Sequence, residues 1–163
     1  MKAIFFDRDG VINKSIDYYI YTKEKLILND GVVETLLELK KNNYSFLVIS
    51  NQSGIAKGLY TIEETEIINN EINETLRKYN IEFLEFYFCY HHPEETKCIC
   101  RKPETLLYEK AIARFKINIS ESWAVGDQER DILPAKNLGL KTILIKSNSN
   151  LKQILPIILN EKK

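Results

Sequence analysis

The sequence predicts an α/β fold in which a doubly wound, mostly parallel sheet carries helices on both faces. Two observations indicate it: short apolar runs alternate with amphipathic segments along the chain, and polar clusters follow several of these runs. Such alternation is typical of parallel sheets that bind ligands beyond the carboxyl ends of their strands. With 163 residues, 44% of them hydrophobic, the chain can bury one core, so we expect a single domain over residues 1–163.

A first β-α-β unit is predicted near the start of the chain. Lys2–Phe6 and Tyr44–Ile49 are apolar runs typical of buried strands. Between them, apolar residues recur with helical spacing in Val32–Lys41, and Asp30-Gly31 precedes this segment as a start signal. The segment Ile12–Leu28 is rich in Tyr and Lys and fits neither pattern, and we interpret it as a flap near the site.

The later elements continue the alternation. A capping box of Thr61 and Glu64 predicts a long helix, and its expected apolar face comprises Ile68, Ile72, Leu76 and Tyr79. Further strands are expected at Glu85–Cys89, Ser122–Val125 and Lys141–Ile145. Further helices are expected at Thr105–Phe115, at Ile132–Leu138 with Gly139 closing it, and at Leu151–Leu159 with a bend or interruption at Pro156.

The composition disfavours several classes of partner. The 23 basic and 23 acidic residues balance without a basic block, which argues against binding to nucleic acid or to an anionic membrane surface. The start of the chain lacks the apolar stretch of a signal peptide, and no segment approaches a membrane span, so we expect a cytoplasmic protein. The three cysteines all lie between Cys89 and Cys100, which favours a reduced compartment or a metal site over a disulfide framework.

Two carboxylates, Asp7 and Asp9, follow the first predicted strand directly. At this edge of a sheet, one carboxylate can attack a phosphorus atom while the other reaches the leaving oxygen as a general acid. A solvated turn after a strand carries the same residues, and for this short motif alone the turn is the favoured interpretation.

Two more groups of polar residues lie next to predicted elements, after the second strand and at the start of a helix. Ser50, Asn51 and Gln52, with Ser53-Gly54 after them, can hold phosphoryl oxygens, although these residue types also favour ordinary turns. Arg101 and Lys102 offer a guanidinium and an ammonium to phosphate, unless they are a solvated basic pair.

Pro103, which follows that pair, suits the first turn of the next helix. Asp127 and Asp131 supply oxygen ligands that suit Mg²⁺, although acidic residues also favour the start of a helix.

The order of these residues resembles that in the haloacid dehalogenase (HAD) superfamily of phosphatases, from Lys2 to about Ile145. FFDRDGVIN (5–13), SNQSGIAKG (50–58) and CRKP (100–103) are similar to motifs of its heptose-bisphosphate and histidinol-phosphate phosphatases. The resemblance implies a HAD-type fold with catalytic motifs within residues 5–131 and a Mg²⁺-dependent reaction through an aspartyl phosphate. A small phosphorylated metabolite is the expected substrate, and we expect the protein to act as a monomer.

The resemblance also implies a role for each motif residue. Asp7 is the nucleophile, Asp9 the general acid and base, and Ser50 and Lys102 brace the phosphoryl group. The expected Mg²⁺ ligands are Asp7, Asp9 and Asp127. Substrate contacts are expected from Ser15, Tyr18, Asn51, Gln52, Ser53, Arg101 and Gln128.

A zinc site is predicted in residues 89–100. Cys89, His91, Cys98 and Cys100 form a C-x-H and C-x-C pattern that suits tetrahedral Zn²⁺ and matches the zinc loop of the group. Buried or idle thiols are the alternative. Four protein ligands leave no position for water, so we expect a structural role. His92 is interpreted as a loop residue.

Some motifs are more similar to those of heptose-bisphosphate phosphatases, and others to those of histidinol-phosphate phosphatases. Gln128 stands where heptose enzymes carry Lys, Tyr90 stands where relatives carry Pro, and Glu104-Thr105-Leu106 lacks the Pro-Gly of the heptose group. The zinc loop is short, as in histidinol-phosphate enzymes, whereas NQSGIAKG is more similar to the heptose group. We expect removal of the 7-phosphate from D-glycero-D-manno-heptose 1,7-bisphosphate, with histidinol phosphate as the alternative substrate.

Two alternatives come from other classes of protein: an inactive scaffold of the same fold and a nucleic-acid end phosphatase. The intact motif residues argue against the scaffold, and the neutral charge balance argues against the end phosphatase.

Overall fold

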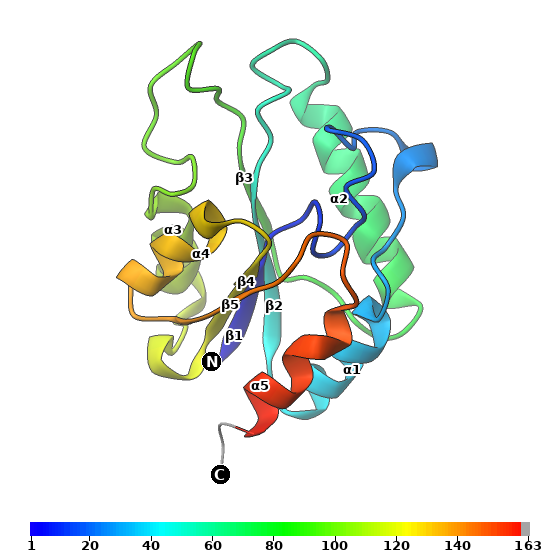
Figure 1. The fold of residues 1–163 in the computed structure, drawn as a ribbon, viewed down its shortest axis with the longest axis vertical. Coiled ribbons are helices and arrows are strands. Elements are labelled where there is room, and N and C mark those ends of the chain that lie inside the picture. Colours follow the sequence, from blue (N-terminus) through cyan, green and yellow to red (C-terminus); the bar gives the residue numbers. More distant parts are fainter. Residues whose placement is uncertain (161–163) are drawn as a thin grey trace.

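The computed structural model describes residues 1–160 and contains a five-stranded sheet in the order β3-β2-β1-β4-β5 (Figure 1). The strands are β1 (Ala3–Phe6), β2 (Ser45–Asn51), β3 (Phe86–Cys89), β4 (Trp123–Gly126) and β5 (Lys141–Leu144). Neighbouring strands pair in parallel throughout, which confirms the predicted α/β fold. The last three residues of the predicted domain lie outside the described residues.

Five α-helices and three short 3-10 helices connect the strands. The α-helices are α1 (Val32–Lys41), α2 (Ile62–Arg77), α3 (Leu106–Phe115), α4 (Glu129–Asn137) and α5 (Leu155–Asn160). The 3-10 helices are η1 (Lys23–Lys25), η2 (Ile119–Glu121) and η3 (Leu151–Ile154). Among the described helices, none has the length and apolar character needed to cross a lipid bilayer.

The central strand β1 supplies both halves of the core, because its side chains alternate between the faces of the sheet. Ile4 and Phe6 pack in the cluster that α1, α2 and α5 cover, whereas Ala3 and Phe5 pack in the cluster under α3 and α4. Figure 1 shows these two groups of helices on opposite sides of the sheet. The four residues of β1 are fully buried, so the residues that follow it start from a rigid position.

Several predicted features agree with the structure. Helix α1 has the predicted bounds, and both hydrogen bonds of the Thr61–Glu64 capping box are present at the start of α2. Gly139 follows α4 with a φ of +89°, a left-handed conformation that glycine adopts at low cost.

Three local predictions are wrong. Tyr79 is half exposed and lies beyond α2, because the helix ends at Arg77. Pro103 does not lie in the first turn of a helix, because α3 begins only at Leu106. Helix α4 begins at Glu129 rather than at Ile132, since its first turn is polar and gives no apolar signal.

The C-terminal helical segment changes type rather than bending at Pro156. Residues 151–154 form the 3-10 helix η3, and α5 continues from Leu155 with Pro156 in its first turn. A proline is tolerated there because the first N–H groups of a helix have no intrahelical partner.

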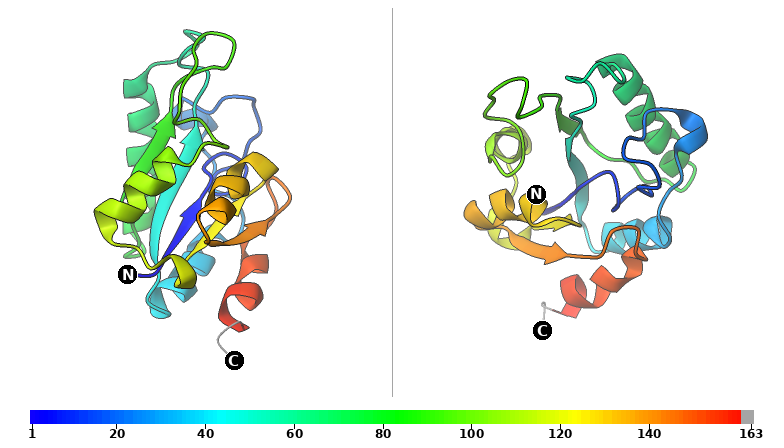
Figure 2. Two further views of the ribbon diagram at one scale, coloured as in Figure 1. Left: turned by 90° about the vertical axis from the view of Figure 1, so that its left-hand side faces the viewer. Right: turned by 45° about the horizontal axis from the view of Figure 1, so that its top comes forward.

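The carboxyl ends of the strands meet at one edge of the sheet, where the long connections gather. The loops that follow β2 and β3 extend beyond this edge, as both views of Figure 2 show. The predicted flap, Ile12–Leu28, lies beside α2, to which Lys23 is joined by an ion pair with Glu71 (Figure 1). The loops after β2 and β3 and the segment Ile12–Leu28 thus lie near the carboxyl edge of the sheet.

Candidate active site

A cavity of about 250 Å³ lies at the carboxyl edge of the sheet. It is lined by every residue that the sequence predicts for catalysis or substrate binding, and by Asp127 as well. The lining includes Ser15 and the exposed Tyr18, so the segment Ile12–Leu28 borders the cavity as predicted. Proximity to the cavity does not assign a role, and the individual roles stay predictions.

Three carboxylates that line the cavity form an acidic group. Asp7, Asp127 and Asp131 each offer an oxygen atom, and these atoms lie within 4.8 Å of one another. The group forms because β1 and β4 are neighbours in the sheet, so that the residues following them come together. Asp131 joins from α4, where its Oδ2 accepts a hydrogen bond from the backbone N–H of Gln128 at 2.9 Å.

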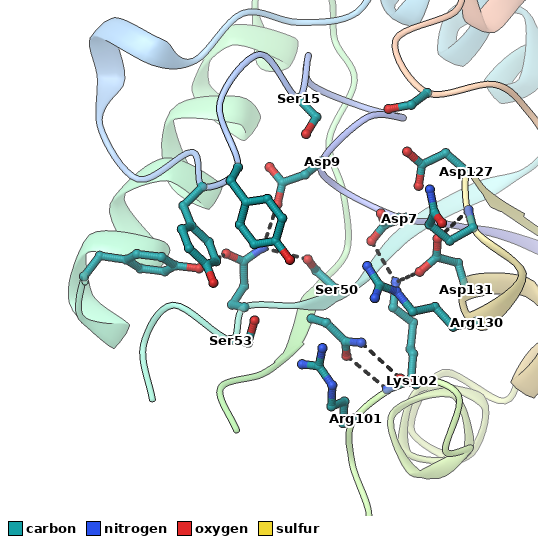
Figure 3. A pocket seen from close by; sticks show the side chains of 17 residues that line it. Asp7, Asp9, Ser15, Ser50, Ser53, Arg101, Lys102, Asp127, Arg130 and Asp131 are labelled. Carbon is teal, nitrogen blue, oxygen red and sulfur yellow. Dashed lines mark hydrogen bonds and ion pairs between the residues drawn. The ribbon is translucent and has the colours of Figure 1, made fainter. Parts of the chain in front are cut away.

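The side chain of Asp9 does not belong to this acidic group, and its predicted place among the metal ligands stays a prediction. Its carboxylate accepts hydrogen bonds from Arg8, from Asn13 Nδ2 at 2.9 Å and from Gln52 Nε2 at 2.8 Å. The structure thus brings Asp131, rather than the Asp9 carboxylate, together with Asp7 and Asp127. Figure 3 shows Asp9 apart from these three, on the side of Ser15 and Ser50.

Lys102 joins the acidic group to the rest of the sheet. Its buried ammonium donates to Asp7 Oδ1 at 2.7 Å, lies 2.8 Å from Asp131 Oδ1, and donates to the carbonyl of Ile49 at 2.7 Å (Figure 3). Burial lowers the pKa of Lys102, but Asp7 and Asp131 more than reverse this effect, so the pKa lies above its ordinary value. The side chain is therefore a fixed cation.

Asn51, which lines the cavity as a predicted substrate contact, also contacts the loop of Lys102. Its side-chain oxygen accepts from the backbone N–H of Lys102 at 3.0 Å, and its Nδ2 donates to the carbonyl of Lys102 at 3.1 Å. The end of β2 thereby holds the backbone of the loop that carries the lysine.

The three carboxylates of the acidic group outnumber the one ammonium, of Lys102, that pairs with them. Burial raises the pKa of Asp7 to about 7, although Lys102 opposes the shift. Burial also raises the pKa of Asp127, and Asp131 adds to that shift. A divalent cation would offset this repulsion, and an oxygen-only donor set suits Mg²⁺. The residues therefore fit a magnesium ion held by Asp7, Asp127 and Asp131.

A second ligand cluster lies in the loop after β3. The ligand atoms of Cys89, His91, Cys98 and Cys100 also lie within 4.8 Å of one another. The Cys89 sulfur is 3.7 Å from that of Cys98 and 3.2 Å from that of Cys100. Two thiolates bound at about 2.3 Å to one tetrahedral zinc would be separated by roughly 3.8 Å, so these residues fit the ion.

Four cavity residues are missing from the sequence prediction: Tyr19, Tyr60, Arg130 and Ser147. Ser147 could have been found, since it follows the fifth predicted strand and the carboxyl-end rule applies to every strand of the sheet. Arg130 lies in the first turn of α4, which was predicted to begin later. Tyr60 packs against Tyr19 and Tyr21, a contact that the sequence does not reveal.

Comparison with known proteins gives the family. A family model described as HAD-hydrolase-like matches residues 99–156. The D-glycero-beta-D-manno-heptose-1,7-bisphosphate 7-phosphatase of Helicobacter pylori strain J99 is 39% identical over 155 residues, which cover 93% of this chain and 86% of that protein. The chain belongs to the HAD family of phosphatases. Its members hydrolyse phosphate monoesters and use Mg²⁺.

Other relatives of this phosphatase include a protein of a different name and a solved structure. The bifunctional histidine biosynthesis protein HisB of Legionella pneumophila strain Lens is 31% identical over 99% of this chain, which spans only 46% of that protein. A crystal structure of D,D-heptose 1,7-bisphosphate phosphatase from B. bronchiseptica, complexed with magnesium and phosphate, has a TM-score of 0.83 at 27% identity. That match covers 96% of this chain and 87% of the other.

Gly10 has no side chain, and this leaves room for Asp127 of the acidic group. Its φ is +90°, and a β-carbon at this position would lie 2.3 Å from Asp127 Oδ2 and 2.5 Å from Ser147 Oγ. We expect Gly10→Ala to displace Asp127 and to raise the Mg²⁺ concentration for half-maximal phosphatase activity by about 10-fold or more, the size of effect known when the support of a metal ligand is lost. A Mg²⁺ titration of activity measures it.

Gly58→Ala is the matched control for this prediction. Gly58 also has a positive φ, of +68°, but a β-carbon there would meet no atom within 4 Å. It should therefore share the backbone strain and leave the Mg²⁺ requirement unchanged. An equal shift in both variants would refute the specific role of Gly10.

Proposed function

We propose that the phosphatase removes the 7-phosphate from D-glycero-D-manno-heptose 1,7-bisphosphate through a phosphorylated Asp7. The observation that carries this proposal is the division of the cavity into two carboxylate environments. Asp7 belongs to an acidic group tied to Lys102, whereas Asp9 faces the same cavity from a separate network of hydrogen-bond donors. Two carboxylates in different surroundings suit the two roles of nucleophile and acid–base.

The proposed reaction proceeds in two displacements. An Asp7 carboxylate oxygen attacks phosphorus, the bond from phosphorus to the ester oxygen breaks, and Asp9 gives that oxygen its proton. Water then attacks the phosphorus of the aspartyl phosphate, Asp9 takes a proton from the water, and inorganic phosphate leaves with Asp7 restored. Ser50, near the carboxyl end of β2, and Lys102, in the loop before α3, contact the phosphoryl oxygens and hold them in place.

A bound Mg²⁺ would neutralise charge on the phosphoryl oxygens and so permit attack by an anion. Asp7, Asp127 and Asp131 are the residues that would hold it. The protein supplies the rest of the electrostatic stabilisation from the Lys102 ammonium, whose geometry is fixed before substrate arrives.

The assignment of the heptose substrate is supported by two features of this chain. The relatives with this substrate in their names, from Helicobacter pylori and from Chlorobaculum tepidum, are 39% and 35% identical to it over more than nine-tenths of its length. The cavity also contains two guanidinium groups, of Arg101 and Arg130, in addition to Lys102. These cations suit a substrate that keeps a second phosphate after the first is removed.

Histidinol phosphate is the second candidate substrate. The HisB relatives favour it, at 31% to 35% identity, although the chain spans less than half of each of them. We further propose a cytoplasmic monomer that acts without nucleic acid or membrane. The neutral charge balance and three cysteines outside any disulfide agree with that proposal.

The first prediction concerns the nucleophile. Asp7→Asn should abolish turnover, because an amide cannot form the covalent intermediate. Phosphate release from a small phosphate monoester measures it, in freshly purified protein whose mass excludes deamidation. Release near the wild-type rate would show that another residue is the nucleophile.

The second prediction concerns zinc. We expect one tightly held Zn²⁺ at Cys89, His91, Cys98 and Cys100, because thiolates and imidazole select zinc while the carboxylates select magnesium. Elemental analysis of protein purified without chelator measures it. Zinc-free protein with three freely titratable thiols would remove the site from the proposal.

The third prediction concerns the retained phosphate. Arg101 is held by its Nη1, which donates to the carbonyl of His91 at 3.2 Å, and so follows the zinc-ligand loop. Arg101→Ala should cost about 2 kcal/mol in kcat/KM for heptose 1,7-bisphosphate, the loss of a charge-assisted contact, and leave histidinol phosphate hydrolysis near wild type. If the wild-type enzyme prefers histidinol phosphate, the heptose assignment is wrong.

A further inference from the structure

Arg8, between the two aspartates, is the largest fully buried side chain of the described residues. Its guanidinium contacts four separate parts of the chain. Nη1 donates to Asn69 Oδ1 of α2 at 3.2 Å, and Nη2 donates to the carbonyl of Ile20 at 2.9 Å and to Gln52 Oε1 at 3.1 Å. The fourth contact, with its neighbour Asp9, is an ion pair of 3.1 Å.

Burying such a cation destabilises the folded state unless its N–H donors all find hydrogen-bond acceptors. Removing a guanidinium from water costs several kcal/mol, and only a matching set of acceptors recovers that cost. The partners of Arg8 come from the turn after β1, the segment 12–28, the end of β2 and the middle of α2. An apolar side chain of similar size would fill this space without that desolvation cost. The presence of a buried guanidinium therefore points to a function in the site.

The consequence for Asp9 is a fixed carboxylate. Asp9 Oδ1 accepts from Arg8 Nε at 3.2 Å and from Asn13 Nδ2 at 2.9 Å. Asp9 Oδ2 accepts from Arg8 Nη2 at 3.1 Å and from Gln52 Nε2 at 2.8 Å. The side chain is still 26% exposed toward the cavity, so it is both oriented and accessible.

We propose that Arg8 is a positioning residue, which aims the Asp9 carboxylate for proton transfer and ties it to the segment 12–28 through the carbonyl of Ile20. The inference rests on the proposed role of Asp9 and adds the residue that orients it. Arg8 itself does not line the cavity. The planar fork of the guanidinium matters, because a lysine ammonium cannot bond both oxygens of Asp9 and the three other acceptors at once.

A general acid has a measurable signature in the leaving group. A stable anion such as 4-nitrophenolate leaves without a proton, whereas the more basic phenolate needs one. The ratio of kcat/KM for 4-nitrophenyl phosphate to that for phenyl phosphate therefore rises when proton transfer is impaired. This ratio reports formation of the phosphoenzyme, and it does not depend on which metabolite is the natural substrate.

The test compares Arg8→Lys, Asn69→Ala and Asp9→Asn with the wild-type enzyme. We expect Arg8→Lys to raise the ratio by about 10-fold or more, approaching Asp9→Asn, for which a loss of about 100-fold on phenyl phosphate is expected. Asn69→Ala removes only the Nη1 contact and should raise the ratio less. A merely structural role would lower both rates equally and leave the ratio unchanged.

Asn73→Ala is the matched control. Asn73 also lies on α2, but its amide bonds both backbone groups of Phe83, away from Arg8. It should lower the melting temperature and leave the ratio unchanged. Hydrogen–deuterium exchange gives a second readout: amides of residues 12–28 should exchange faster in Arg8→Lys than in Asn73→Ala, because only the former loses the contact with Ile20.

The outcomes separate this inference from the proposed function. If Asp9→Asn raises the ratio and folded Arg8→Lys and Asn69→Ala do not, the role of Arg8 is wrong while that of Asp9 stands. If Asp9→Asn leaves the ratio unchanged, both fall. An equal rise in Asn69→Ala and Asn73→Ala would also overturn the inference. Should Arg8→Lys fail to fold by circular dichroism, Asn69→Ala decides the outcome, and unchanged exchange in residues 12–28 would refute the tie to that segment.

Discussion

The contacts of the Lys102 ammonium hold the site together. This single group joins Asp7 after β1, the carbonyl of Ile49 in β2 and Asp131 in α4. Breaking one partner of such a buried ion pair typically costs about 3–5 kcal/mol, because the remaining charge stays buried without compensation. The geometry of the acidic group is thus coupled to the packing of the sheet, and Asn51 extends the coupling to the backbone of the lysine loop.

The turn after β1 separates two functions over three residues. Asp7 points to the acidic group, Arg8 into the interior between α2 and the segment 12–28, and Asp9 toward the cavity from the other side. Gly10 completes the turn in a conformation that brings the chain close to Asp127. One carboxylate can therefore serve covalent chemistry while a network of N–H donors holds the other apart from it, facing the same cavity.

The sequence predicted the fold well because its signals are local. Apolar runs mark the strands, and helix α1 lies between clear start and stop signals, so its bounds are correct. Local signals also caused the errors. The apolar spacing continues to Tyr79 although the chain leaves the helix before Asn80, which has a φ of +57°. The interpretation as a single domain stays a prediction.

For the site, the sequence predicted which residues meet but not how each side chain is directed. The carboxyl-end rule brings the motif residues to one cavity, and the structure agrees. The choice between Asp9 and Asp131 as the third member of the acidic group depends on the path of a four-residue turn and on the register of α4. The sequence did not reveal the burial of Arg8 either, because its partners other than Asp9 lie 12 to 61 residues away in the chain.

The charges of the site are unevenly distributed. In their ionised forms, Asp7, Asp127 and Asp131 with Lys102 leave two formal negative charges, while Arg8 balances Asp9 within its own network. A phosphate dianion that approached this group alone would be repelled. A divalent cation held there would cancel the excess, whereas Arg101 and Arg130, also in the cavity, would attract the phosphate. The cavity thus places an anionic site for a cation beside cationic groups that suit a phosphate.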